Sequence, residues 1–179
     1  MTLDLKQKGY QVLQDMDQIA EVKSEKLAGF TAYEHNEDAL HRQMDLSLST
    51  QTALGILSEN KKGFFLMVEG SQIDWGGHQN NTIFIVNEML DSDKAIGKAL
   101  EFASTDGKTL IIITADHETG GFALTGGNMK AGMVQGAFST GGHTGIMVPV
   151  FAYGPGAEEF RGIMENSVIG KKIIEFVKH

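Results

Sequence analysis

Residues 64–78, FFLMVEGSQIDWGGH, decide the fold, because five apolar residues run directly into a polar segment. The run at 64–68 has the length of a strand and does not alternate with polar residues, which is typical of a strand buried on both faces. Two further strands are predicted at 110–114 (LIIIT) and 147–153. Apolar residues at helical spacing predict three helices around them, over 47–60, 80–102 and 167–178.

This alternation of strands and helices predicts an α/β fold in three layers, with a mostly parallel sheet and helices on both faces. Shorter elements are predicted in the first part of the chain: a helix end at 3–8, strands at 10–13 and 26–31, a helix from Met16 to Glu25 and a loop at 32–46. The 179 residues show no internal repeat or low-complexity segment, so we expect a single domain over 1–179.

Composition narrows the possible partners. The chain has no cysteine, so disulfides and thiolate metal sites are excluded. The net charge of -8 makes nucleic acid or an anionic membrane a poor partner. No apolar run approaches the roughly 20 residues needed to cross a bilayer. The first ten residues, MTLDLKQKGY, lack the apolar stretch of a signal peptide, although a fragment's N-terminus says nothing about export.

Six side chains suited to metal binding lie at the carboxyl ends or flanks of the predicted strands: Glu69, Asp74, His78, Asp116, His117 and His143. Ligands gather at this edge of a parallel sheet. Imidazole and carboxylate donors suit zinc, magnesium or manganese. The cluster therefore predicts a metal site.

Each group of these candidate ligands can also be explained without a metal ion. Asp74 and His78 are four residues apart, which places them on one face of a helical turn, either as chelating ligands or as a common surface pair. Asp116 and His117 leave a strand, where an aspartate can equally cap a turn. His143 sits among glycines and could be a loop histidine.

Glu69 is harder to explain without a cation, because a carboxylate at the end of a buried strand needs a partner. Trp75, beside Asp74, either lines the approach to the site or packs. Three other histidines are expected to be exposed or in loops: His35, His41 and His179.

Taken together, the order of these motifs resembles the alkaline phosphatase family. The matching strings are VEGSQIDWGGH (68–78), TADHETGG (114–121), GGHTG (141–145) and AYGPGA (152–157). The resemblance also covers SENKKGFFLMVEG (58–70) and extends upstream to KGYQVL, so it spans nearly the whole chain.

The resemblance implies a role for each candidate ligand. Asp74, His78 and His143 would bind one zinc ion, Asp116 and His117 a second, and Glu69 a magnesium ion. The implied reaction is hydrolysis of phosphate monoesters through a phosphoserine, in which two metal ions stabilise the attacking and leaving oxygens. The family further implies a periplasmic or extracellular location.

The chain also departs from the family pattern. The nucleophilic serine of the family, with an aspartate, a threonine and an arginine that act beside it, has no counterpart in this sequence. We therefore interpret the chain as the C-terminal part of such an enzyme and expect it to be inactive alone. The sheet would then keep an exposed apolar edge that favours self-association. Alternatives are a phosphoglycerate-mutase-like two-metal enzyme and a non-catalytic metal-binding module.

Overall fold

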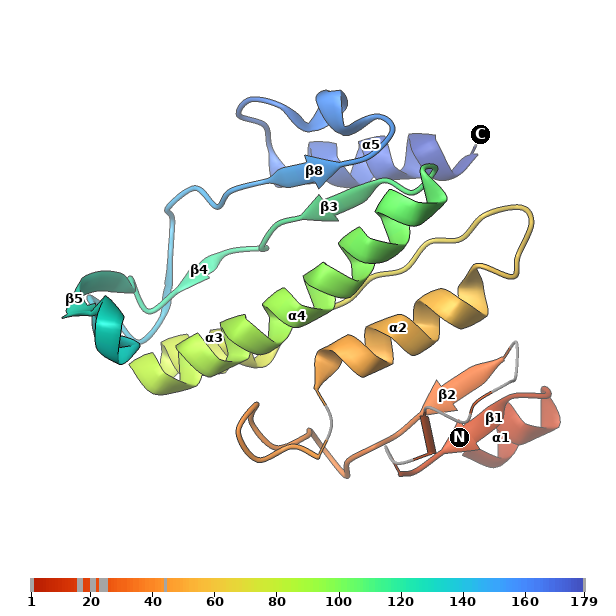
Figure 1. Cartoon of the computed structure of the whole chain (residues 1–179), viewed down its shortest axis with the longest axis horizontal. Coiled ribbons are helices and arrows are strands. Elements are labelled where there is room, and N and C mark those ends of the chain that lie inside the picture. Colours follow the sequence, from red (N-terminus) through yellow and green to blue (C-terminus); the bar gives the residue numbers. More distant parts are fainter. Residues whose placement is uncertain (1, 16–17, 20–21, 23–25, 44, 179) are drawn as a thin grey trace. The chain divides into compact units, whose positions relative to one another are not determined.

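The computed structural model describes residues 2–15, 18–19, 22, 26–43 and 45–178 (Figure 1). The chain divides into two compact units, Met1–Glu69 with Leu90–Ala99 and Gly70–Met89 with Leu100–His179. The single domain expected over 1–179 stays a prediction. The helix predicted from Met16 to Glu25 lies largely outside the described residues.

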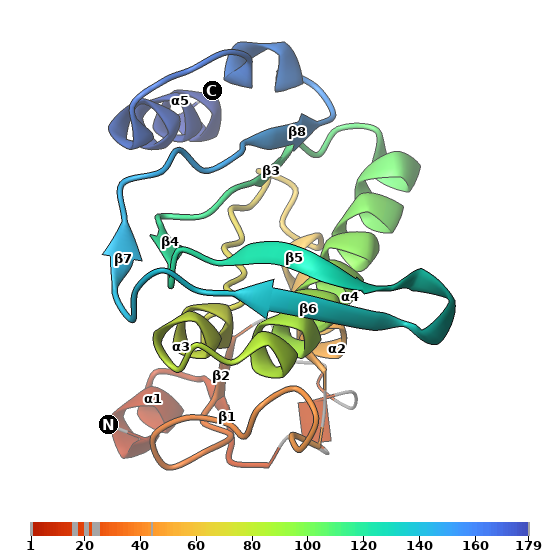
Figure 2. The ribbon, with the colours of Figure 1, turned by 90° about the vertical axis from the view of Figure 1, so that its left-hand side faces the viewer.

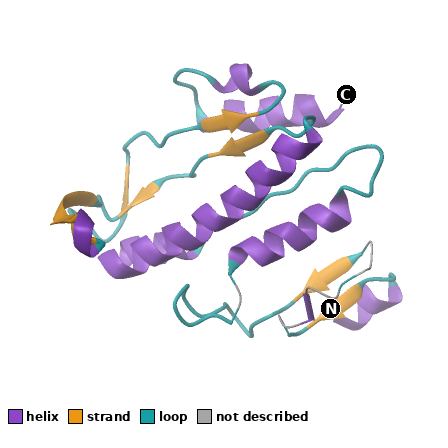
Figure 3. Cartoon of the chain, in the orientation of Figure 1, coloured by secondary structure: helices purple, strands orange, loops and turns teal. Residues whose placement is uncertain are grey.

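Helices and strands are distributed over both units (Figure 3). The first unit contains α1 (Thr2–Gln7), β1 (Gln11–Leu13), β2 (Leu27–Gly29) and α2 (Leu46–Leu57). The second contains α3 (Gln72–His78), β3 (Ile111–Ile113), β4 (Glu118–Thr119), β5 (Ala123–Asn128), η2 (Met129–Ala131), β6 (Met133–Ala137), β7 (His143–Thr144), β8 (Phe151–Tyr153), η3 (Ala157–Phe160) and α5 (Asn166–Lys178). Helix α4 (Thr82–Asp106) has residues in both.

Side-chain caps explain where the longer helices begin and end. The Asp45 side chain accepts a hydrogen bond from the Leu48 amide (3.2 Å) and starts α2. The Asn81 side chain does the same for the Phe84 amide (3.1 Å) and starts α4. Helix α4 stops at Gly107, whose φ of 67° is the left-handed conformation that glycine tolerates at a helix end. None of the helices in the described chain is long and apolar enough to span a membrane.

A largely buried ion pair joins the segment before α2 to the middle of α4 within the first unit. The Arg42 guanidinium lies 3.2 Å from the Asp91 carboxylate, and their side chains are only 16% and 6% exposed. Asp91 also accepts a hydrogen bond from the Leu46 amide (3.2 Å). The carboxylate therefore joins two helices that are distant in sequence.

Four two-stranded ladders make up the described sheet structure. β1 and β2 are parallel, whereas β3 pairs with β8, β4 with β7 and β5 with β6 in antiparallel fashion. In the β4–β7 ladder, Thr119 lies opposite His143. The β5–β6 hairpin projects from the glycine-rich segment after β4 (Figure 2).

The sequence predicted most helices correctly and the strands only in part. Helices predicted over 47–60, 80–102 and 167–178 are α2, α4 and α5, and β3 lies within the strand predicted at 110–114. Of the strand predicted at 147–153, only Phe151–Tyr153 pairs. The hairpin β5–β6 was not predicted.

The apolar run at 64–68 departs most from the prediction. It joins no ladder among the described residues, and its side chains alternate between half-buried and exposed, with Phe65 56% and Met67 76% exposed. The expected strand buried on both faces is therefore wrong for this segment, since it is not a paired strand in the described chain and three of its five side chains are exposed. Among the described residues, one of the four ladders, β1–β2, is parallel.

Candidate metal centre

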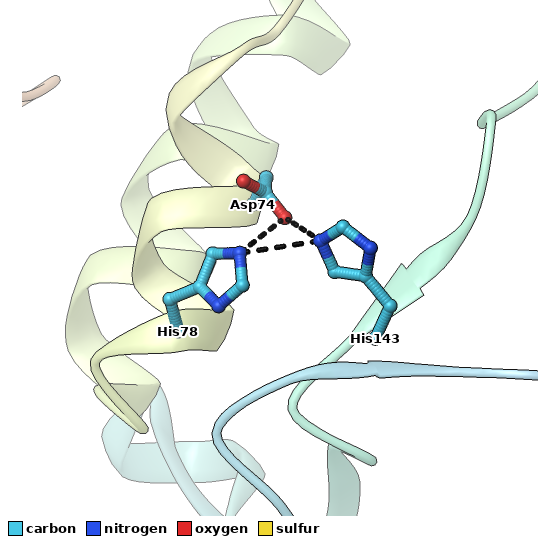
Figure 4. Close-up of side chains that lie close together, drawn as sticks. All are labelled: Asp74, His78 and His143. Carbon is cyan, nitrogen blue, oxygen red and sulfur yellow. Dashed lines mark hydrogen bonds and ion pairs between the residues drawn. The ribbon is translucent and has the colours of Figure 1, made fainter.

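Three of the six candidate ligands meet at one place in the second unit. Asp74, His78 and His143 each present a ligand atom, and these atoms lie within 4.8 Å of one another. Figure 4 shows the three side chains pointing toward a common centre, two from α3 and one from β7. The Asp74 Oδ1 atom is 3.4 Å from His78 Nε2 and 3.5 Å from His143 Nε2, and the two Nε2 atoms are 3.2 Å apart.

Local structure explains this convergence. Residues 72–78 form a helix, so the four-residue spacing places Asp74 and His78 on one face, as predicted. His143 reaches the same place because β7 pairs with β4, which lies against α3. The His78 Nδ1 atom is 2.8 Å from the Gly141 carbonyl oxygen. A carbonyl only accepts, so Nδ1 carries a proton and Nε2 offers its lone pair in the neutral ring.

Two glycines allow α3 to approach β4. A Cβ atom at Gly77 would lie 2.7 Å from the Thr119 carbonyl oxygen and 2.8 Å from the Thr119 Cβ. Gly120, with φ of 94°, has the Gly77 carbonyl oxygen 2.9 Å from the position of its missing Cβ. Side chains at these positions would force the helix and the strand apart.

Asp116 and His117 lie next to this triad. The His117 ring stacks on the His143 ring, with centroids 3.7 Å apart and an interplanar angle of 21°. The His117 Nε2 atom is 3.3 Å from the Asp116 Oδ2 atom. This pair brings together two further donor side chains beside the three of the triad.

Glu69 ends the first of the two segments that make up the first unit, and its side chain is exposed. We expected Glu69 to be buried and therefore to need a cation as a partner. The exposed carboxylate does not have that need. Trp75 is half-buried on α3, and both interpretations of it stay open. His35 and His41 are exposed, as expected, whereas His179 lies outside the described residues.

Two residues of the site were not singled out from the sequence. The Thr119 hydroxyl donates to Asp74 Oδ1 (2.5 Å) and lies 3.2 Å from His117 Nδ1. The Glu118 carboxylate accepts hydrogen bonds from the Gly121 and Phe122 amides and from the Thr144 hydroxyl. Both residues stand within TADHETGG, but threonine and glutamate are common in loops, and no spacing rule distinguishes them there.

Hydrogen bonding around Glu118 holds the loop beside His143. Burial alone would raise the pKa of this carboxyl, but the hydrogen bonds from Thr144, Phe122 and Gly121 outweigh it and lower the pKa. Because Thr144 directly follows His143 in β7, the charged Glu118 side chain fastens this strand to the turn after β4.

The alternating helices and strands and the Asp–His–His triad define an α/β protein with a candidate metal site. The chain belongs to the alkaline phosphatase family, whose profile, described as "Alkaline phosphatase", matches residues 1–137.

Curated and solved relatives agree with this assignment. The chain is 30% identical to alkaline phosphatase 4 of Bacillus subtilis, in an alignment covering 99% of this chain and 54% of the relative. It is 42% identical to the solved alkaline phosphatase of the Antarctic bacterium TAB5, with a TM-score of 0.84, covering 97% of this chain and 53% of that one. A variant of the TAB5 enzyme, 40% identical to this chain with a TM-score of 0.82, was solved with magnesium bound; the match covers 97% of this chain and 54% of that one.

These neighbours confirm the α/β class and the partial alkaline-phosphatase-like fold. The chain spans about half the length of alkaline phosphatases 3 and 4 of Bacillus subtilis.

Proposed function

We propose that this chain carries the greater part of the metal-binding residues of a phosphate monoesterase, with Asp74, His78 and His143 as the ligands of one zinc ion. The observation that carries the proposal is the convergence of these ligand atoms within 4.8 Å in a member of the alkaline phosphatase family. Two imidazole nitrogens and one carboxylate oxygen, with a fourth position open, are a donor set typical of catalytic zinc.

We further propose Asp116 and His117 as ligands of a second zinc ion and Glu69 as a ligand of magnesium. The stacking of His117 on His143 supports neighbouring positions for the two zinc ions. The magnesium bound in the solved TAB5 variant supports a magnesium site in the family. Zinc bound at such positions acts as a Lewis acid toward phosphate oxygens.

The residues of this chain would prepare the site for that chemistry. Gly141 holds the His78 ring with Nε2 toward the centre. Asp74 contributes one negative charge, so the site keeps a net positive charge for an anionic ester once a dication is bound. The triad is half-exposed, which leaves the open position accessible to substrate.

We expect the 179 residues alone to hydrolyse phosphate esters slowly or not at all. No serine in the chain stands in the Asp-Ser context after a strand that the resemblance requires of the nucleophile. Export to the periplasm or the exterior is proposed from the family alone. The named relatives are alkaline phosphatases, which favours monoester hydrolysis over a phosphoglycerate-mutase-like reaction.

Zinc titration of the metal-free chain by calorimetry, with p-nitrophenyl phosphate turnover measured in parallel, tests the proposal. Zinc should bind to the wild type, and His78→Ala or His143→Ala should lower the affinity by more than about 100-fold, since loss of even a hydrogen-bond partner of a ligand costs about 10–100-fold. His35→Ala, at an exposed histidine outside the site, serves as the control.

Zinc binding that survives both triad substitutions would exclude the site. If zinc binds without turnover, a second polypeptide should be added. It should correspond to the part of alkaline phosphatase 4 that lies outside the match to this chain. Restored turnover supports the enzyme, and continued inactivity of an assembled complex supports the non-catalytic module.

A further inference from the structure

Thr119 lies between the two groups of candidate ligands. Its hydroxyl oxygen is 2.5 Å from Asp74 Oδ1, on the triad, and 3.2 Å from His117 Nδ1, on the neighbouring pair. Residues 74, 117 and 119 all belong to the second unit, and the Thr119 side chain is partly buried. None of the roles proposed above involves this hydroxyl.

The directions of these two hydrogen bonds follow from the number of protons available. A hydroxyl has one proton, and an ionised carboxylate can only accept. The shorter contact is to Asp74, so the hydroxyl proton points there. The Nδ1 atom of His117 must then donate its own proton to a lone pair of the Thr119 oxygen.

This direction sets the state of the His117 ring. With the proton on Nδ1, the lone pair of the neutral ring is on Nε2, the nitrogen that lies 3.3 Å from Asp116 Oδ2. A lone pair and a carboxylate oxygen that face each other at this distance need a cation or a proton between them. The arrangement therefore leaves a position between Asp116 and His117 that a proton or a metal ion can fill.

We propose that Thr119 is a positioning residue that couples the two cation sites, through the chain His117 Nδ1–H to Thr119 Oγ1–H to Asp74 Oδ1. The proposal rests on the assignment of these residues as metal ligands. The hydroxyl orients the Asp74 carboxylate toward His78 and His143 and, through its oxygen, selects the His117 tautomer that can bind metal. Occupancy of either site then favours occupancy of the other.

The surroundings of Thr119 hold the hydroxyl in place. Its backbone is paired with β7 opposite His143, and its Cβ and Cγ2 atoms lie against Gly77. The Cβ branch restricts χ1. Thr119→Val therefore preserves the shape and removes the hydroxyl, while Thr119→Ser preserves the hydroxyl.

Nitrogen-15 NMR of the histidine rings tests the tautomer without metal and without turnover. In the zinc-free wild type, Nδ1 of His117 should carry a proton. In a neutral ring Nε2 is then unprotonated, and in a cationic ring both nitrogens are protonated. The His117 signal is identified by its loss in His117→Gln. Thr119→Ser should keep this state, and Thr119→Val should move the proton toward Nε2. A wild-type ring protonated at Nε2 alone overturns the proposal, whether or not the valine variant folds.

Zinc titration provides the second measurement. Thr119→Val should weaken zinc binding by about 10–100-fold, the usual effect of removing a hydrogen-bond partner of a ligand, and Thr119→Ser should restore most of it. Thr125→Val, at an exposed position of β5, is the matched control and should bind zinc as the wild type does. Unchanged zinc affinity in Thr119→Val, or a loss that serine does not restore, contradicts the proposal.

The two readouts separate this inference from the proposed function. If the wild type binds no zinc, the proposed function fails, and the tautomer of the zinc-free protein still decides whether Thr119 orients His117. If the wild type binds zinc and the His117 tautomer is the same in Thr119→Val as in the wild type, the proposed coupling through Thr119 fails and the proposed function stands.

Discussion

Position 77 determines how closely α3 can approach β4, because the space for a side chain there is already filled by Thr119. We expect Gly77→Ala to push the helix outward, carrying Asp74 and His78 away from His143. Overfilling a packed contact costs about 1–3 kcal/mol, so the free energy of unfolding in urea should fall by that amount. Zinc affinity should fall with it.

Gly97 provides the matched control for this substitution. It is exposed in the interior of α4, and a Cβ atom there would meet nothing within 4 Å. Gly97→Ala should stabilise the protein by about 0.5–1 kcal/mol, because alanine loses less backbone entropy than glycine in a helix. Equal effects of the two substitutions would show that helix propensity, rather than the contact with Thr119, governs position 77.

At the residue scale, the sequence identified the ligands better than their supports. Residue type and strand-end position were enough to select Asp74, His78 and His143, which the structure brings together. Thr119 could not be selected this way, because its role depends on a strand pairing and a glycine contact that are set by tertiary structure.

Among the elements, α2 depends on its N-terminal cap. The Asp45 carboxylate accepts hydrogen bonds from the Ser47 hydroxyl (2.7 Å) and the Leu48 amide (3.2 Å), and Lys94 lies 3.7 Å away. Asp45→Ala should cost about 1 kcal/mol of unfolding free energy, the usual worth of a cap. Asp45→Asn should cost much less, since asparagine also caps helices.

The same carboxylate makes stability depend on pH. The hydrogen bond from Ser47, aided by the Leu48 amide and Lys94, lowers the pKa of Asp45 against the effect of burial. Because the folded pKa lies below the unfolded one, the contribution is complete above the unfolded value of about 3.9 and is lost as pH falls through the folded pKa. Urea unfolding followed from neutral to acidic pH should therefore show a smaller decline in Asp45→Asn than in the wild type. An identical decline would exclude Asp45 as a source of the acid sensitivity.

The ion pair between Arg42 and Asp91 joins the segment before α2 to α4, and removing one partner should be costly. Asp91→Ala removes the carboxylate beside the largely buried Arg42 guanidinium and takes an acceptor from the Leu46 amide. The expected loss is about 3–5 kcal/mol of unfolding free energy. The double variant Arg42→Met, Asp91→Leu should recover part of this loss, because apolar replacements of a buried pair are often tolerated. If Asp91→Ala lowers the free energy of unfolding by less than an ordinary surface substitution does, the ion pair has no structural role.

How far each element could be predicted depended on its local signals. Helix α4 has a clear apolar period, a capping Asn81 and a terminating Gly107, and all three signals lie within the segment. The hairpin β5–β6 has none of them: its strands are largely exposed and rich in glycine, so no alternating pattern marks them. Residues 64–68 carry a strong strand signal, but a ladder also requires a neighbouring strand, which no local pattern can reveal.

On the scale of the whole molecule, the segment 64–68 has both apolar side chains and backbone groups outside any described ladder. Phe65, Met67 and Val68 are 56%, 76% and 42% exposed. An extended, apolar segment of this kind offers a template for another chain, whose strand would cover it. The chain also spans only about half of the length of alkaline phosphatase 4 of Bacillus subtilis. We therefore expect self-association in the micromolar to millimolar range.

The last prediction concerns the surface through which this association occurs. Size-exclusion chromatography with light scattering should show a mass that rises with concentration, and Met67→Lys should shift the rise to higher concentration, because a lysine on an edge strand opposes pairing. Met129→Lys makes the same change in charge at a methionine that is 99% exposed in η2, next to the β5–β6 hairpin, and should leave the association as it is. If both lysines act equally, general charge repulsion explains the effect. If the wild type stays monomeric throughout, the segment 64–68 is protected in a way that its exposure does not reveal.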